Sequence, residues 1–409
     1  MDYYELAEAE LEDEELVPEL LPVDARLSIR TLAPILISLF ERAVAVTPAK
    51  EVIPNTGYAK FEAFASDISS VPYVQLTATD GERSLVVMAE GVQVAMAGEV
   101  LLPPKRVLSI LKLVSTEMVR MEVIGNSCTI RSGRAQWTVQ VPGGTDIIPL
   151  PDTSNTSLVG VNTKAFLDAL NVARKAAATN TARSALMQIR IRSGALTGCD
   201  GARIHKKTVP GLSTELDASI ALNTADELMK ALRNSHSETF EMGISHNLTA
   251  FRIDSDVLIG QRLNLPFPDV DSLLYGPFMS NTDTVVVNTA ALADAVRHVR
   301  VSADPDFAGI FLAIVPGKKR DDGAMSWNVS VRARDKIGNS ASETVPCTWD
   351  GAKARELCIN HHSLLDLLDV FSEEEISLKL GEDTKQRRSS VYVQTEDFQA
   401  SLAQMTVLK

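Results

Sequence analysis

The stretch VNTKAFLDALNVAR, residues 161–174, recurs as VNTAALADAVRHVR at residues 287–300. Asn162 and Asn288 are 126 residues apart. A second pair has nearly the same offset, because LTATDGERSLVV and LTGCDGARIHKK place Asp80 and Asp200 120 residues apart. Two different motifs that repeat at one spacing indicate a duplicated structural unit.

Weaker copies extend the repeat to three. SIRTLAPILISLFERA, from Ser28, resembles the repeated helix, and VRARDKIGNSA places Asp335 135 residues after Asp200. Each unit also carries a second helix-like stretch, with short strand-like runs between the helices. We therefore predict an α+β fold of three tandem domains, each with two helices packed on an antiparallel sheet. The predicted boundaries are 26–152, 153–281 and 282–409.

Charge is distributed unevenly along the 409 residues, whose net charge is -13. Residues 1–24 contain ten acidic residues and no Lys or Arg, whereas the rest of the chain holds 43 acidic and 40 basic residues. We expect residues 1–25 to be a disordered acidic tail in front of a nearly neutral body. No apolar run is long enough to span a bilayer and no signal peptide is visible, so we expect a cytoplasmic protein.

The repeated aspartates could be the paired carboxylates of a duplicated-lobe protease. That pair needs Asp-Thr/Ser-Gly, whereas Asp80 and Asp200 are followed directly by glycine. Asp-Gly between apolar residues is typical of a hairpin in which both turn residues have positive φ. The patterns GxSxG, HExxH and GxxxxGK[ST] do not occur, the four cysteines are scattered, and His361 and His362 are predicted to point apart at a solvated helix end. We expect no enzyme, no metal site and no cofactor.

The motifs, taken in order over residues 26–409, resemble the bacterial sliding clamp, the beta subunit of DNA polymerase III. CTIRSGRAQWTVQV, from Cys128, is the most specific match, and ALTGCDGARI and LNLPFPDVDSLL match the second domain. The chain departs from the family at Ser272, where a base is common, at Ser363, where an aromatic residue is common, and in its ending, MTVLK. The resemblance implies a head-to-tail homodimeric ring of six domains around duplex DNA, with helices lining the hole.

Basic and polar residues would face the DNA in such a ring. A solvated helix surface is the alternative for any one of them, but their recurrence on a nearly neutral body favours contact with phosphate. Few strong phosphate contacts would suit a protein that slides. The DNA-facing candidates are Arg42, Lys50, Lys105, Arg106, Lys112, Lys164, Arg174, Lys175, Thr179, Asn180, Lys230, Arg233, Arg297 and Arg300.

Two further surfaces follow from the resemblance. A groove between the second and third domains would bind an extended peptide of a partner, with interdomain core as the alternative; its positions are Leu186, Cys199, Gly201, Arg203, Ile204, Pro268, Leu273, Ser390, Met405, Thr406 and Val407. In the dimer interface Arg134, Trp137 and Val139 would meet Val301, Ser302, Phe307 and Glu343 of a second copy. We expect Arg134 to pair with Glu343, although Trp137 could equally be a core residue.

The function implied by the resemblance is a processivity factor. Its partners would be double-stranded DNA bound without sequence preference, a DNA polymerase, a clamp-loader ATPase and a second copy of the chain. A clamp-fold scaffold that binds replication or repair proteins without encircling DNA is the alternative. A hydrolase that uses Asp80 and Asp200 is a distant third.

Overall fold

The structure is a computed structural model that describes residues 25–405, apart from gaps at 49, 51–52, 66–70, 116, 154–155, 264, 276–282, 320–324, 352 and 382–389. Residues 1–24 of the predicted tail lie outside the described residues, and Ala25 already begins the first strand. The chain forms two compact units, unit 1 (Met1–Gly160 and Lys230–Gln261) and unit 2 (Val161–Met229 and Arg262–Lys409). The division into three domains remains a prediction beside these two units.

Unit 1 contains two antiparallel sheets, one of which joins parts of the first two sequence repeats. The link is β17, which pairs with β4 through Val257 and Val86, so the second repeat extends the sheet of the first. One sheet has the order β5 (Val92–Met96), β1 (Ala25–Leu32), β7 (Met118–Ile124), β8 (Ser127–Ser132), β9 (Ala135–Gln140). The other has the order β10 (Leu158–Asn162), β15 (Thr239–Ile244), β16 (Leu248–Ile253), β17 (Asp256–Gln261), β4 (Arg83–Ala89), β3 (Tyr73–Thr79), β2 (Ala59–Phe64), β6 (Gly98–Leu102).

Unit 2 is built on one antiparallel sheet of twelve strands. Here β13 pairs with β25 through Ile204 and Ser401, so this sheet also runs from one sequence repeat into the next. The strand order is β14 (Asp217–Ala221), β11 (Gln188–Arg192), β12 (Ala195–Cys199), β13 (Arg203–Thr208), β25 (Phe398–Ala403), β24 (Ser390–Gln394), β23 (Glu375–Leu380), β18 (Asp283–Asn288), β21 (Ser340–Trp349), β20 (Met325–Arg334), β19 (Gly309–Lys319), β22 (Arg355–Asn360).

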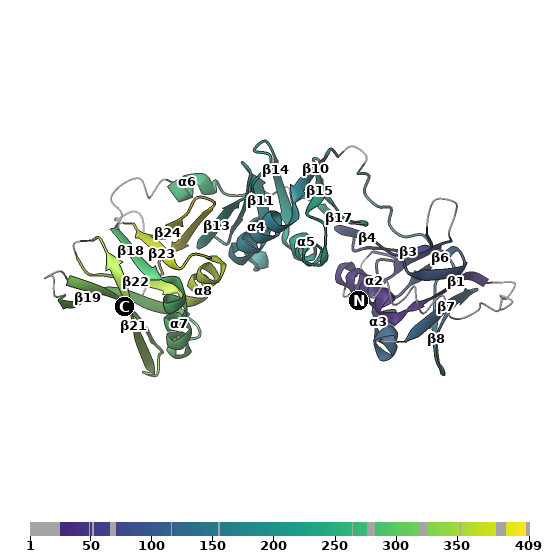
Figure 1. Ribbon diagram of the computed structural model, residues 1–409, viewed down its shortest axis with the longest axis horizontal. Coiled ribbons are helices and arrows are strands. Elements are labelled where there is room, and N and C mark those ends of the chain that lie inside the picture. Colours follow the sequence, from purple (N-terminus) through teal and green to yellow (C-terminus); the bar gives the residue numbers. More distant parts are fainter. Residues whose placement is uncertain are drawn as a thin grey trace. The chain divides into compact units, whose positions relative to one another are not determined.

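The helices pack on these sheets: α2 contacts β4, and α7 contacts β21. Figure 1 shows α2 beside α3 and α7 beside α8. Among the described residues, no helix is both long and apolar enough to cross a bilayer. Unit 1 contains α2 (Ala33–Val46), α3 (Pro104–Leu111) and the short helix η1 (Lys112–Val114), and α5 (Leu222–Asn234) runs from unit 2 into unit 1. Unit 2 contains α4 (Thr163–Ala176), η2 (Thr181–Leu186), α6 (Val270–Tyr275), α7 (Thr289–Val299), η3 (Arg300–Ser302) and α8 (His361–Val370).

The repeated Val-Asn-Thr motif begins a helix. Asn162 Oδ1 accepts a hydrogen bond from Ala165 N at 2.9 Å, and Asn288 Oδ1 accepts one from Ala291 N at 2.9 Å. Asn360 caps α8 in the same way. An asparagine at this position satisfies backbone N–H groups that have no partner within the helix. The repeat therefore recurs because each copy starts a helix at the same point after a strand.

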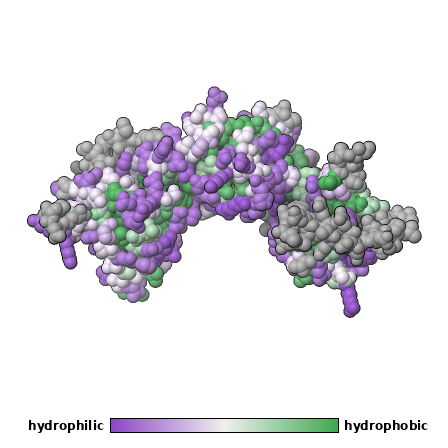
Figure 2. All heavy atoms as spheres, in the orientation of Figure 1, coloured by the Kyte–Doolittle hydropathy of each residue, from purple (hydrophilic) through white to green (hydrophobic). Residues whose placement is uncertain are grey.

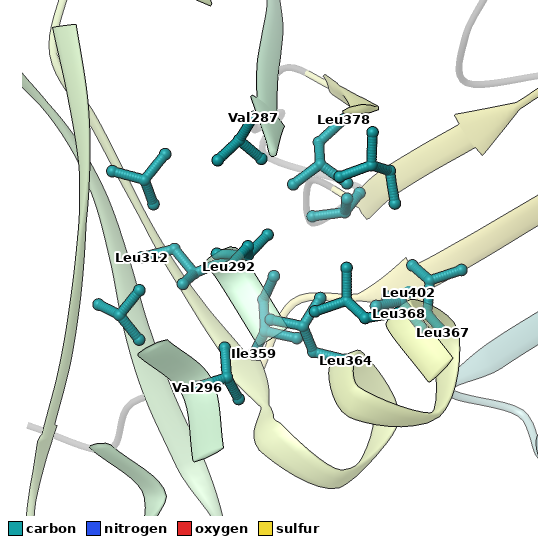
Figure 3. Packing of buried hydrophobic residues seen from close by; sticks show 14 of the residues in the cluster. Val287, Leu292, Val296, Leu312, Ile359, Leu364, Leu367, Leu368, Leu378 and Leu402 are labelled. Atoms are coloured by element: carbon teal, nitrogen blue, oxygen red, sulfur yellow. The ribbon is translucent and has the colours of Figure 1, made fainter. Parts of the chain in front are cut away.

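Apolar side chains from both helices and strands form the core of unit 2. Figure 3 shows Leu292 and Val296 of α7 and Leu364 of α8 meeting strand residues such as Leu312 and Ile359. Leu292, Val296 and Leu364 are all 0% exposed. The helical spacing of apolar residues in the sequence therefore marks the helix faces that are buried on the sheet.

Candidate functional site

The repeated Asp-Gly dipeptides form hairpin turns, as the sequence predicted. Asp80 Oδ1 accepts hydrogen bonds from Glu82 N at 2.9 Å and Arg83 N at 2.6 Å. Asp200 Oδ1 does the same for Ala202 N at 2.8 Å and Arg203 N at 2.9 Å. The predicted backbone conformation was wrong in one respect: within each dipeptide, only the glycine has positive φ. The reason is that the aspartate carboxylate, rather than a left-handed Asp backbone, closes the turn.

A third aspartate closes the hairpin between β20 and β21. Asp335 Oδ1 accepts hydrogen bonds from Ile337 N at 3.0 Å and Asn339 N at 2.8 Å. All three carboxylates are therefore engaged by the backbone of their own turns. In the described part of the chain, no group of three or more His, Cys, Asp and Glu side chains is placed to hold a metal ion.

The second of these turns borders a small apolar cluster in unit 2, which we call the Cys199 cluster. Its buried members are Cys199 and Ile204 from the hairpin, Val270 and Leu274 from α6, and Tyr392 from β24. Half-buried Leu186 and Phe267 pack against it. Three segments that are distant in the sequence thus meet at the position of the predicted groove.

The last described residues run past the same turn. Ala403 N donates to Ala202 O at 2.7 Å, and Met405 N donates to Cys358 O at 2.8 Å, so residues 403–405 run from the hairpin to β22. Ser390 pairs with Ala403 at the start of β24. Thr406 and Val407 lie outside the described residues, and the side chain of Leu273 is not described.

The Cys199 cluster is filled by its own side chains. Cys199 is 2% exposed, Leu274 0% and Tyr392 2%. Burial raises the pKa of the Cys199 thiol, so this side chain behaves as a small apolar group. Sequence reasoning did not include Val270, Leu274, Tyr392 and Phe267, although the spacing of Val270 and Leu274 places them on one helix face.

Glycine is required where the hairpin meets its surroundings. Gly201 has a φ of +89°, and a Cβ there would lie 3.1 Å from Arg183 Nη1. Arg183, in η2, donates a hydrogen bond to Asp200 O across this glycine. Gly198 allows α4 to approach β12, because a Cβ there would lie 1.8 Å from Ala173 O. The turn is thereby held between η2 and the strands.

A polar cavity of about 40 Å³ adjoins the Cys199 cluster and shares Phe267 and Val270 with it. Three cations from β11 and β13 line the cavity. Two of them are paired, Arg190 with Asp217, and Lys206 with Asp271 at 2.5 Å. The complete lining is Arg190, Arg192, Thr197, Lys206, Phe267, Pro268, Asp269, Val270 and Asp271.

The predicted DNA-facing residues of unit 1 lie mostly on helix surfaces. Two of them are held by acidic residues of the same chain: Arg42 pairs with Asp256, and Lys112 Nζ lies 2.7 Å from Glu41 Oε1. Lys105 Nζ donates to Pro48 O at 3.1 Å. Lys50, Arg106, Lys230 and Arg233 are exposed.

The candidates of unit 2 are similar. Arg174 Nε lies 2.6 Å from Asp226 Oδ1, and Lys175 Nζ lies 3.2 Å from Asp366 Oδ1. Arg297 pairs with both Asp294 and Asp369. The other candidates of unit 2 are exposed: Lys164, Arg300, and the neighbouring loop residues Thr179 and Asn180. Bases that already have acidic partners attract phosphate less strongly than free bases do.

Three of the predicted interface residues lie in strands, Trp137 and Val139 in β9 and Glu343 in β21, whereas Val301 and Ser302 lie in η3. Among the described residues, β9 pairs only with β8, and residues 340–346 of β21 pair only with β20. Arg134 is exposed beside β9, and Trp137 is half-buried. Val139 is 1% exposed, so its side chain belongs to the core of its own unit and offers a partner only backbone groups.

In unit 2, Val301 is 85% exposed. Most of the coloured surface in Figure 2 is hydrophilic. Ser302 and Phe307 are half-buried. Glu343 Oε2 already has a partner, since His298 Nδ1 lies 2.8 Å away.

Two histidines are buried in unit 2. His205 Nδ1 lies 3.2 Å from Val172 O, and burial lowers its pKa to about 4. Burial likewise lowers the pKa of His361 to about 4. The prediction for His361 and His362 was wrong, because their rings are 4.0 Å apart and His361 is only 7% exposed. In the first turn of α8, the side chain of His361 is buried, whereas that of His362 is exposed.

Comparison with known proteins identified likeness at the level of structure. Neither a protein-family model nor a curated protein sequence matches the chain. The beta sliding clamp of C. crescentus superposes with a TM-score of 0.81 at 17% identity, covering 93% of this chain and 99% of that one. The DNA polymerase III subunit beta of Pseudomonas aeruginosa gives 0.77 at 17% identity over 93% and 100%, and the sliding clamp of Bacillus subtilis gives 0.80 at 15% over 94% and 100%. The chain therefore has the fold of the bacterial sliding clamps.

Proposed function

We propose that the protein is a DNA sliding clamp, a non-enzymatic processivity factor that encircles duplex DNA as a homodimeric ring in the cytoplasm. The observation that carries the proposal is the clamp fold, which extends over 93% of the chain and almost the full length of the C. crescentus clamp. A ring needs the whole arc of domains, so a likeness of this extent supports a ring better than a match to one domain would. The ring tethers a DNA polymerase and is opened by a separate clamp-loader ATPase.

Open strand edges support closure into a ring. Among the described residues, β9 and residues 340–346 of β21 each have one side that is not paired with a strand of this chain, and each side is available to a strand of another copy. A head-to-tail dimer with two-fold symmetry pairs both kinds of edge twice and leaves neither exposed. Arg134 of one copy would then meet Glu343 of the other. Val301 would be covered in the same interface.

Charge on the helices supports sliding rather than tight binding. Arg42, Arg174 and Arg297 are each paired with an acidic residue of their own chain. Such pairs reduce the number of counterions released on DNA binding, and therefore the affinity for DNA. A closed ring does not need high affinity, because its topology retains it on the duplex.

The Cys199 cluster is the proposed docking place for an extended peptide with Leu and Phe anchors, which would displace Leu186 and Phe267.

Retention by topology can be tested without a loader. The full chain is incubated with linear duplex DNA that carries biotin at both ends, so that rings thread on from the ends, and streptavidin is then added to block them. After a shift to high salt, which weakens direct phosphate contacts, we expect protein to remain on blocked DNA and to leave open DNA. Equal retention on both would show binding by direct contact and would refute the ring.

The scaffold alternative predicts a different result. A clamp-fold monomer would be lost from blocked and open DNA alike, yet would still bind a Leu/Phe peptide. Its mass in solution would be that of one chain, 44.3 kDa. Sedimentation of the full chain therefore separates the two functions before any DNA is added.

A further inference from the structure

Four charged side chains of unit 2 form a continuous series of hydrogen bonds. Asp366, on α8, accepts from two cations: Oδ1 from Lys175 Nζ at 3.2 Å and Oδ2 from Arg203 Nη1 at 2.5 Å. Arg203 Nε in turn donates to Asp200 Oδ2 at 2.9 Å. The order is therefore Lys175, Asp366, Arg203, Asp200, and every link is a direct hydrogen bond between ionised groups.

The two ends of this series belong to different proposed sites. Lys175 is in the last turn of α4, is 44% exposed, and belongs to the proposed DNA-facing set. Asp200 closes the turn that contains Gly201, which borders the Cys199 cluster. A second tie reaches the same turn, because Arg183 donates to Asp200 O from η2, directly after the proposed DNA-contacting pair Thr179 and Asn180.

Asp366 divides its two oxygens between two cations. Lys175 and Arg203 share the negative charge of Asp366 and repel each other. Asp366 therefore holds each cation less firmly than it would hold one cation alone. A phosphate that binds Lys175 neutralises one of the two cations and leaves both oxygens of Asp366 to Arg203, whose planar guanidinium can donate two hydrogen bonds to one carboxylate. Arg203 is 15% exposed, so solvent weakens this effect only in part.

We propose that duplex DNA bound at Lys175 strengthens peptide binding at the Cys199 cluster, with Asp366 as the positioning residue that links the two sites. DNA releases Asp366 from Lys175, Asp366 holds Arg203 more firmly, and Arg203 fixes the Asp200–Gly201 turn that borders the cluster. The inference rests on the proposed function and adds to it a preference for partners on clamps that already surround DNA. By linkage, a bound peptide strengthens DNA binding by the same factor.

The size of the effect follows from one partly exposed ion pair. Such pairs change affinity by about two- to fivefold. The peptide dissociation constant is measured by fluorescence polarisation, with a labelled hexapeptide that carries Leu and Phe anchors. The full-length protein is titrated alone and in the presence of saturating short duplex at low salt. We expect the dissociation constant to fall about two- to fivefold when duplex is present.

The chain offers a matched control three residues away on α8. Asp369 is also an aspartate paired with a proposed DNA-facing base, Arg297, at 2.8 Å. In the part of the chain that the structure describes, Arg297 pairs with Asp294 and Asp369 and not with a residue of the Asp200 turn. The substitution Asp369→Asn should keep the duplex effect, whereas Asp366→Asn should abolish it. Lys175→Gln approaches the link from the other end: it removes the competing cation, so peptide binding in the absence of duplex should strengthen about two- to fivefold, and duplex should then add no further effect.

The outcomes separate this inference from the proposed function. If the unsubstituted protein binds neither duplex nor peptide, the proposed function fails and the inference fails with it. If it binds both but duplex leaves the peptide dissociation constant unchanged or raises it, the coupling is refuted while the function stands. An effect that persists in both Asp366→Asn and Lys175→Gln would also refute the link through Asp366.

Discussion

The substitutions Asp80→Asn and Asp200→Asn test whether the repeated aspartates are structural. In both turns one carboxylate oxygen accepts from the backbone and the other accepts from an arginine, Arg83 Nε at 2.9 Å and Arg203 Nε at 2.9 Å. Asparagine keeps one acceptor oxygen for the backbone but loses the charge-assisted bond to arginine. Hydrogen bonds to charged groups contribute about 1.5–3 kcal/mol each.

Partial exposure reduces that figure. Asp80 and Arg83 are each 13% exposed, and Asp200 and Arg203 are 22% and 15% exposed. We therefore expect either substitution to lower the free energy of unfolding by about 1–2 kcal/mol, with Asp80→Asn at the upper end. Chemical denaturation followed by circular dichroism measures this loss for each variant against the unsubstituted protein.

Peptide binding then distinguishes the two turns. Only Asp200 borders the Cys199 cluster, so we expect Asp200→Asn to weaken binding of the Leu/Phe hexapeptide about fivefold, which corresponds to about 1 kcal/mol. Asp80→Asn is the matched control and should leave binding unchanged. The reasoning would be refuted if both variants lost peptide binding equally, or if Asp200→Asn lost stability but bound peptide normally.

Three further predictions concern pH, the dimer and the tail. The lowered pKa of His205, about 4 against 6.5, means that the unfolded state binds a proton that the folded state does not, so the free energy of unfolding should fall by about 3 kcal/mol as pH drops from about 6.5 to 4. His205→Gln should make this part of the profile less steep in denaturation measurements, leaving the slope due to His361, whose pKa is lowered to about the same value; an unchanged profile would contradict the assignment. Arg134→Glu and Glu343→Arg should each raise the dimer dissociation constant by roughly tenfold, because each places like charges at both interfaces of the ring. The double variant should restore the dissociation constant. Sedimentation that shows the double variant to dimerise more weakly than either single variant would exclude this pairing. Deleting residues 1–24, which contain ten acidic and no basic residues, should leave retention on end-blocked duplex unchanged, whereas a clear gain would identify the tail as a competitor of DNA.

Sequence reasoning succeeded where structure depends on near neighbours. The Val-Asn-Thr repeat marks helix starts because Asn162 and Asn288 cap a backbone N–H three residues ahead. The Asp-Gly repeat marks turns because each aspartate bonds to backbone two and three residues ahead. Apolar spacing identified the buried helix faces for the same reason. In these cases the interacting atoms lie within a few residues, so the sequence alone contains the information.

Errors and omissions occurred where burial depends on distant segments. His361 begins a helix with a polar dipeptide, which resembles a solvated end, yet the fold around it leaves it 7% exposed. Tyr392 was missed in the Cys199 cluster because β24 is separated from the hairpin by most of the second half of the chain.

The sequence by itself determined the repeating architecture, the helix starts, the turns and the uneven distribution of charge. Only the tertiary structure decided how the repeats join through β17 with β4 and β13 with β25, and which charges meet. Arg42 finds Asp256, and Asp366 is shared by Lys175 and Arg203. Caps and turns are settled by hydrogen bonds within a few residues, whereas these ion pairs exist only after strands from different repeats have paired and have brought their helices together.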